Sequence, residues 1–189
     1  MKNVRNALLG LYFNLLMVIL LLFFLFKGML DNNMGNWVQW TLAAGLFVSG
    51  IFNVVFAVMN AVKTFSFYKS NDYNSMRKNM KTLKFGIIPY FVINFIIYLL
   101  LFLLFFVASR GIILVTPIPL IFLIPIAFTY FTVIFTSTYG IGFSLILYKE
   151  KRLRAGKLIL HIILQLCFIL DVIDTMVLLV KNKVIKISE

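Results

Sequence analysis

The chain has few of the residues on which soluble folds and their sites depend. Charged residues make up 13% of its 189 positions and hydrophobic residues 62%, whereas a soluble domain carries about 25% charged residues. Too little polar surface remains to face water, so the bilayer must be the solvent. The single cysteine, Cys167, excludes an internal disulfide and any CxxC site.

Sequence patterns that carry enzyme chemistry are also missing. The chain contains no GxSxG, HExxH or Walker lysine pattern, and the single histidine has no cysteine or serine partner at a meaningful spacing. We therefore expect no enzyme, no cofactor and no metal site. The net charge of +12 does not indicate nucleic acid, because the basic residues lie in short runs between apolar segments. That arrangement favours anionic lipid headgroups as partners.

Four apolar segments are long enough to cross a membrane, which takes a helix of about 20 residues. They are residues 7–26, 38–62, 85–109 and 126–148. A signal peptide is the alternative for the first segment, but its apolar run is longer than a signal peptide needs. The sequence thus predicts an all-α integral membrane bundle, with residues 1–189 forming a single membrane domain.

Lysine and arginine are distributed unequally between the two sides of these segments. One side receives 13, in residues 1–6, 63–84 and 149–157, and the other receives Lys27 and Arg110. Positively charged loops stay in the cytoplasm. We therefore expect a multi-pass protein of the cell membrane with a cytoplasmic N-terminus and four crossings.

The basic stretch 63–84 leads into the third apolar segment. Ser75 is the expected N-cap of a helix that begins at Met76. Arg77, Lys81 and Lys84 then share one helix face, which we expect to contact lipid phosphates. A charged surface that is merely solvated is the alternative.

Residues 112–125 are apolar but contain three prolines, which interrupt helices. We expect this piece to lie in, or dip into, the outer interface. Alternatively, it forms the first turns of a long fourth helix.

The C-terminal segment 158–180 has the length of a span, yet four polar residues lie on one side of it as a helix. They are His161, Gln165, Asp171 and Asp174. Apolar residues contribute about −0.3 to −0.6 kcal/mol each to insertion, whereas each aspartate costs about 2.5–3.5 kcal/mol. Crossing would also place the last three lysines outside. We predict an amphipathic helix at the cytoplasmic surface, with a fifth span as the alternative. An Asp–His proton relay or metal site is a further interpretation of the same residues.

Residues 2–11 (KNVRNALLGL) and 78–87 (KNMKTLKFGI) are similar, and each precedes a span, a loop and a second span. This similarity predicts tandem helical hairpins, 1–69 and 78–149.

Small residues recur every four positions in two of the segments, which allows helix backbones to approach closely in lipid. The second segment carries Gly45, Ser49, Asn53, Ala57 and Ala61, and the fourth carries Thr132, Thr136, Gly140 and Ser144. We expect these two ladders to pack against each other. The alternative is that each packs on a different neighbour or on a second subunit.

Four amides lie within the apolar segments and should face the bundle. They are Asn14, Asn53, Asn60 and Asn94. They form either interhelical hydrogen bonds or the lining of a polar transport path.

The stretch HIILQLCFILDVIDTMVLL, residues 161–179, resembles the C-terminal part of small uncharacterised multi-pass membrane proteins of anaerobic Gram-positive bacteria. This resemblance implies a bacterial membrane protein but no activity. Short loops and small-residue ladders favour a non-enzymatic helix-packing subunit or accessory of a membrane complex, which contacts itself or another membrane protein. A small transporter or channel with a polar intramembrane path is the alternative.

Overall fold

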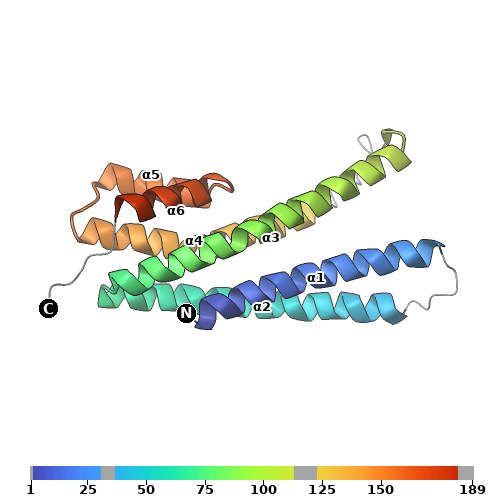
Figure 1. Ribbon diagram of the computed structural model, residues 1–189, viewed down its shortest axis with the longest axis horizontal. Helices are drawn as coiled ribbons and strands as arrows, with labels where there is room; N and C mark the ends of the chain where they lie inside the picture. Colours follow the sequence, from blue (N-terminus) through green and yellow to red (C-terminus); the bar gives the residue numbers. More distant parts are fainter. Residues whose placement is uncertain (1, 31–36, 113–122, 183–189) are drawn as a thin grey trace. The chain divides into compact units, whose positions relative to one another are not determined.

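The computed structural model describes residues 2–30, 37–112 and 123–182, and within these ranges the chain is helical and contains no strand (Figure 1). The helices are α1 (Lys2–Leu30), α2 (Trp37–Ser70), α3 (Tyr73–Ala108), α4 (Leu123–Lys149), α5 (Ala155–Leu166) and α6 (Leu170–Lys181). α1, α2, α3 and α4 are each long and apolar enough to cross a membrane. The predicted all-α class with four membrane-length helices is therefore confirmed. Most of residues 112–125 lies outside the described ranges, and α4 begins at Leu123.

The chain divides into two compact units, Met1–Met59 and Asn60–Glu189. The boundary falls inside α2 and not between the two expected hairpins. In the first unit, α1 and the first part of α2 lie side by side (Figure 1). The tandem repeat of hairpins stays a prediction.

The second unit is built around α4, which contacts α3, α5 and α6. α3 and α4 bury apolar side chains at the ends that lie nearest the basic stretches. The most deeply buried are Met76, Met80, Leu83 and Ile87 of α3, and Val133, Phe143, Ile146 and Leu147 of α4. The core of this unit therefore lies at its basic end, and the opposite half of α3 exposes apolar residues such as Phe95 and Val107.

A tight turn joins α2 to α3. Asn71 adopts a left-handed backbone conformation with φ of 54°, which asparagine tolerates better than most residues. The Asp72 carboxylate then accepts a hydrogen bond of 3.0 Å from the Ser75 amide, so Asp72 is the N-cap and the helix begins at Tyr73. The prediction that Ser75 caps a helix from Met76 is wrong, because the acid three residues earlier satisfies the free amide.

Candidate functional site

The C-terminal segment is a helical hairpin and not one amphipathic helix. α5 ends at Leu166 and α6 begins at Leu170, and Figure 1 shows the two lying side by side. Each has 12 residues, or about 18 Å of helix, which is too short to cross a hydrocarbon core of about 30 Å. Both ends of the hairpin therefore lie on the same side of the unit.

The polar side of this segment faces the protein interior. Gln165 and Asp171 are fully buried and Asp174 is 2% exposed. The outer surface of the hairpin is apolar instead, and Ile159, Ile169 and Val180 are all more than half exposed. The expectation that the polar face meets headgroups is wrong, because these side chains find partners on α3, α4 and each other.

Seven buried or part-buried side chains form what we call the polar cluster. Its members are Lys84 of α3, Ser137 of α4, His161 and Gln165 of α5, and Asp171, Asp174 and Thr175 of α6. Four helices thus contribute to a single hydrogen-bonded group in the second unit.

Lys84 occupies the centre of the polar cluster and is 1% exposed. Its Nζ pairs with Asp171 Oδ1 and donates to Ser137 Oγ at 3.0 Å. Ser137 in turn donates to the backbone carbonyl of Gln165 at 2.5 Å. The prediction that Lys84 contacts lipid headgroups is therefore wrong, since its ammonium ties α3 to both α4 and α6.

Asp174 is held across the hairpin by two residues of α5. Gln165 Nε2 donates to Asp174 Oδ2 at 2.8 Å and to Thr175 Oγ1 at 3.1 Å. His161 Nδ1 lies 2.5 Å from Asp174 Oδ1. These bonds connect the two arms of the hairpin, so folding back at residues 167–169 satisfies polar groups that one straight helix would leave unpaired.

Two buried acceptor atoms in the polar cluster have no hydrogen-bond donor. They are Gln165 Oε1 and Asp171 Oδ2. Most buried acceptors in proteins are satisfied by protein or water, so these two atoms are exceptions within the polar cluster. No three His, Cys, Asp or Glu side chains are grouped as metal ligands in the described residues.

Arg77 also serves an internal role. Its guanidinium donates to the carbonyls of Leu179, at 2.9 Å, and Asn182, at 3.0 Å. Carbonyls at a helix C-terminus lack partners within the helix and favour a positive charge. Arg77 therefore caps α6, and of the three residues expected to face lipid phosphates Lys81 remains exposed.

The four amides of the apolar segments do not share one set of partners. In the first unit, Asn14 Nδ2 donates to Ser49 Oγ at 2.8 Å, and the buried Asn53 Oδ1 has no partner. In the second, Tyr139 donates to Asn60 at 3.0 Å and Asn94 donates to Thr129 at 2.9 Å.

The two partners on α4, Thr129 and Tyr139, are ten residues apart in the sequence, which is about 15 Å along the helix. Within the second unit, Asn60 and Asn94 therefore make two separate interhelical contacts, and a shared polar path stays a prediction.

The glycines of the two small-residue ladders, Gly45 and Gly140, lie against different helices. A side chain at Gly45 would meet Met17 of α1, and one at Gly140 would collide with Gln165 of α5. The hydroxyls of Thr136 and Ser144 bond to carbonyls of their own helix. At Gly45 and Gly140, the structure therefore agrees with the alternative prediction that each ladder packs on a different neighbour.

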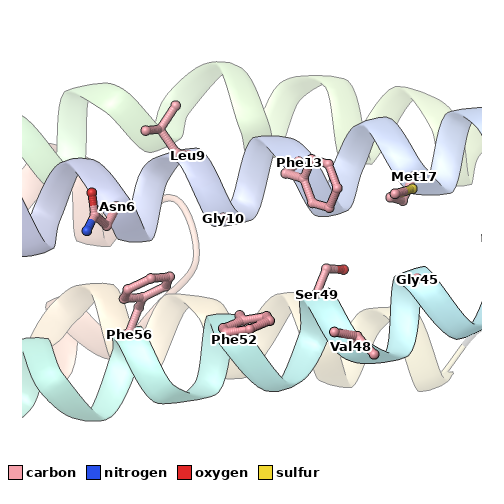
Figure 2. A pocket seen from close by; sticks show the side chains of 10 residues that line it. All are labelled: Asn6, Leu9, Gly10, Phe13, Met17, Gly45, Val48, Ser49, Phe52 and Phe56. Carbon is pink, nitrogen blue, oxygen red and sulfur yellow. The ribbon is translucent and has the colours of Figure 1, made fainter.

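An apolar groove of about 570 Å³ lies between α1 and α2 in the first unit. Figure 2 shows the side chains that line it. They are Asn6, Leu9, Gly10, Phe13 and Met17 of α1, and Gly45, Val48, Ser49, Phe52 and Phe56 of α2. The phenylalanines make its walls apolar, and at Gly10 the absence of a side chain leaves space for Asn53 of α2.

Sequence reasoning identified every acidic and amide member of the polar cluster but assigned them the wrong surroundings. It missed Ser137, Thr175 and the pairing of Lys84. The available signal was charge: a lysine and two aspartates next to apolar segments are costly in lipid unless they pair with each other.

Comparison with known proteins gives a family and no activity. No curated protein and no solved structure matches the chain. The profile of DUF6652, described as a family of unknown function, matches residues 2–184, which is nearly the whole chain, and the protein therefore belongs to this family.

Proposed function

We propose that this protein is a non-enzymatic, multi-pass membrane protein that acts through helix contacts, as a packing subunit or accessory of a membrane complex. Its polar side chains support this function, because in the described residues they are used mainly to hold the protein's own helices together. Its apolar side chains face outward in large number, for example Phe47 and Val62, at 72% and 65% exposed. Such surfaces suit lipid and other membrane helices.

The proposed topology has a cytoplasmic N-terminus and four crossings. The hairpin of α5 and α6 enters the cytoplasmic leaflet and returns to the same side. Its open end carries the basic residues 149–157 and Lys181, which matches the preference of positive charge for the cytoplasm. Exposed Lys78 and Lys81 supply further contacts to anionic headgroups.

The groove between α1 and α2 is the observation that carries the proposal. It combines two glycines with apolar walls. Small residues allow the backbone of an entering helix to approach closely, and the apolar walls can pack against its side chains. A second copy of this chain or a different membrane protein would supply that helix.

A matched pair of cysteine variants tests the groove as a contact surface. Val48 lines the groove, whereas Val54 lies on another face of α2, and the two are equally exposed at 50% and 49%. In a Cys167→Ala background, Val48→Cys should crosslink to a partner in native membranes and Val54→Cys should not. Two differently tagged copies distinguish self-association from a second protein. Equal crosslinking at both positions, or none at Val48→Cys, contradicts the proposal.

A small transporter remains the second candidate, favoured by the buried charges of Lys84, Asp171 and Asp174. Ionisable residues within membrane segments often mark ion or proton paths. Reconstituted into vesicles with a pH-sensitive dye inside, a proton-coupled transporter should carry a flux that Asp174→Asn abolishes. Absence of flux above protein-free vesicles favours the packing function.

A further inference from the structure

The polar cluster contains one more negative charge than its lysine can balance. The Asp171 and Asp174 carboxylates are 0% and 2% exposed, and Lys84 is the ammonium buried with them. Lys84 pairs directly with Asp171, which leaves Asp174 without a cationic partner if His161 is neutral. A buried charge without a partner is strongly unfavourable, so the cluster is balanced only when it takes up one positive charge.

The other groups around the polar cluster do not supply that charge. α4 contributes the neutral Ser137 hydroxyl, beside Lys84, and the backbone of Gly140, beside Gln165. α3 contributes Lys84, and its Arg77 is engaged by carbonyls at the far end of α6. Among the described residues, the imidazole of His161 is thus the group that can balance Asp174.

The geometry around His161 suits this role. Its Nδ1 lies 2.5 Å from Asp174 Oδ1, so a hydrogen lies between the two atoms. The other oxygen of Asp174 accepts from Gln165, which orients the carboxylate toward the ring. The imidazole keeps 13% of its surface exposed, so a proton can reach it from solvent.

We propose that His161 and Asp174 form a binding site for one proton, and that the protonated pair fastens the α5–α6 hairpin to α3 and α4. The proton adds to the imidazole ring, which becomes a cation and pairs with the Asp174 carboxylate; no other bond forms or breaks. When the proton leaves, Asp174 remains as an uncompensated buried charge and the hairpin loosens. The hairpin is therefore held at lower pH and released as pH rises. This goes beyond the proposed packing function and does not depend on it.

Nuclear magnetic resonance of the full-length protein tests the site directly, because the chain has a single histidine. The protein is labelled with ¹⁵N-histidine, purified through a tag without histidine and held in detergent micelles at pH 7.5, where free histidine is mainly neutral. We expect the nitrogen shifts of a doubly protonated ring in the native protein and of a neutral ring in Asp174→Asn. A neutral ring in the native protein, or an unchanged ring in Asp174→Asn, overturns the proposal.

Glu150→Gln is the matched control for lost negative charge. Glu150 pairs with Arg152 at 3.2 Å, outside the polar cluster. This variant should keep the ring doubly protonated, because Asp174 is intact. A neutral ring in Glu150→Gln would show that overall charge controls the histidine, and this too overturns the proposal.

Hydrogen exchange of α5 and α6 tests whether the proton holds the hairpin. Exchange is compared at pH 6 and pH 8.5 after correction for the pH dependence of free amides. Protection in the native protein should fall at least tenfold at the higher pH, and in His161→Gln and Asp174→Asn it should not depend on pH. If protection also falls at pH 8.5 in both variants, or does not fall in the native protein, the proton does not hold the hairpin in place.

Discussion

Lys84 illustrates how strongly the surroundings of one residue decide its role. Lys81 and Lys84 lie in the same basic stretch, one helical turn apart, yet Lys81 is exposed and Lys84 is 1% exposed. The second position faces Asp171 and Ser137, so its ammonium becomes an internal contact. Two lysines with similar neighbours in the sequence therefore have opposite environments in the structure, one exposed and one buried.

This difference leads to a prediction for two lysine variants. Lys84→Met keeps an unbranched side chain of similar length but leaves Asp171 buried without its partner. Breaking a buried pair in this way costs about 3–5 kcal/mol, whereas exposed substitutions usually lie within about 0.5 kcal/mol. Thermal unfolding in detergent should therefore show a large fall in midpoint for Lys84→Met and little change for Lys81→Met.

The double variant Lys84→Met with Asp171→Leu removes both charges and should recover part of the lost stability. If Lys84→Met unfolds at the same temperature as Lys81→Met, the buried ion pair does not stabilise the protein.

Individual polar residues could be predicted from sequence only in part. An aspartate or histidine inside an apolar run is conspicuous, so Asp171, Asp174 and His161 were identified as notable. Their partners were not, because Lys84 lies 87 residues from Asp171 and no local pattern shows that two distant helices meet. Ser137 is missed for the same reason, since a serine in a helix is unremarkable until a lysine reaches it.

At the scale of elements, the reversal of the chain between α5 and α6 is the largest difference from the predicted single helix over residues 158–180. Residues 167–169 contain neither proline nor glycine, and no side chain caps the start of α6. Length and hydrophobicity therefore indicated one helix. The break is explained by tertiary contacts: Gln165 reaches Asp174 and Thr175 once the segment has folded back.

The four long helices were predictable because each depends on a continuous apolar run. Their ends are less so, since α2 and α3 extend well beyond the apolar segments through residues 63–84. Asn71 and Asp72 join the two extensions, and their turn and cap need few long-range contacts.

The contact between α4 and α5 gives a prediction for two glycines. A methyl group at Gly140 would collide with the Gln165 side chain, whereas one at Gly156 meets no atom within 4 Å. Overpacking a buried contact costs about 1–3 kcal/mol, while glycine to alanine at an open helical position is neutral or favourable by about 0.5–1 kcal/mol.

Gly140→Ala should therefore increase hydrogen exchange in α5 and lower the unfolding midpoint, and Gly156→Ala should do neither. Matching behaviour of the two variants would mean that α5 does not pack on Gly140 as the structure shows.

At the scale of the whole molecule, charge asymmetry and the hairpin both support the proposed topology. Thirteen basic residues lie in three stretches and two lie in the intervening loops. The hairpin helices, of 12 residues each, are too short to cross a membrane, so the proposed topology keeps Lys181 on the side of the three basic stretches. In the sequence, the apolar gain and the aspartate cost of segment 158–180 nearly cancel, and the charge of the last three lysines favours a surface helix over a fifth span. The hairpin removes that conflict: the aspartates are buried in protein, and the segment has no need to cross.

A cysteine placed at Ser188 tests this topology in a Cys167→Ala background. We expect no labelling of intact cells by a reagent that cannot cross the membrane, because in the proposed topology both arms of the hairpin end on the cytoplasmic side. A cysteine at Asn33 should be labelled from outside, and one at Glu150 should be protected until the cells are opened. Labelling at Ser188 in intact cells would require a crossing by residues 158–180. Asp171 and Asp174 would then lie within a span, and the hairpin that encloses the polar cluster could not exist in the membrane.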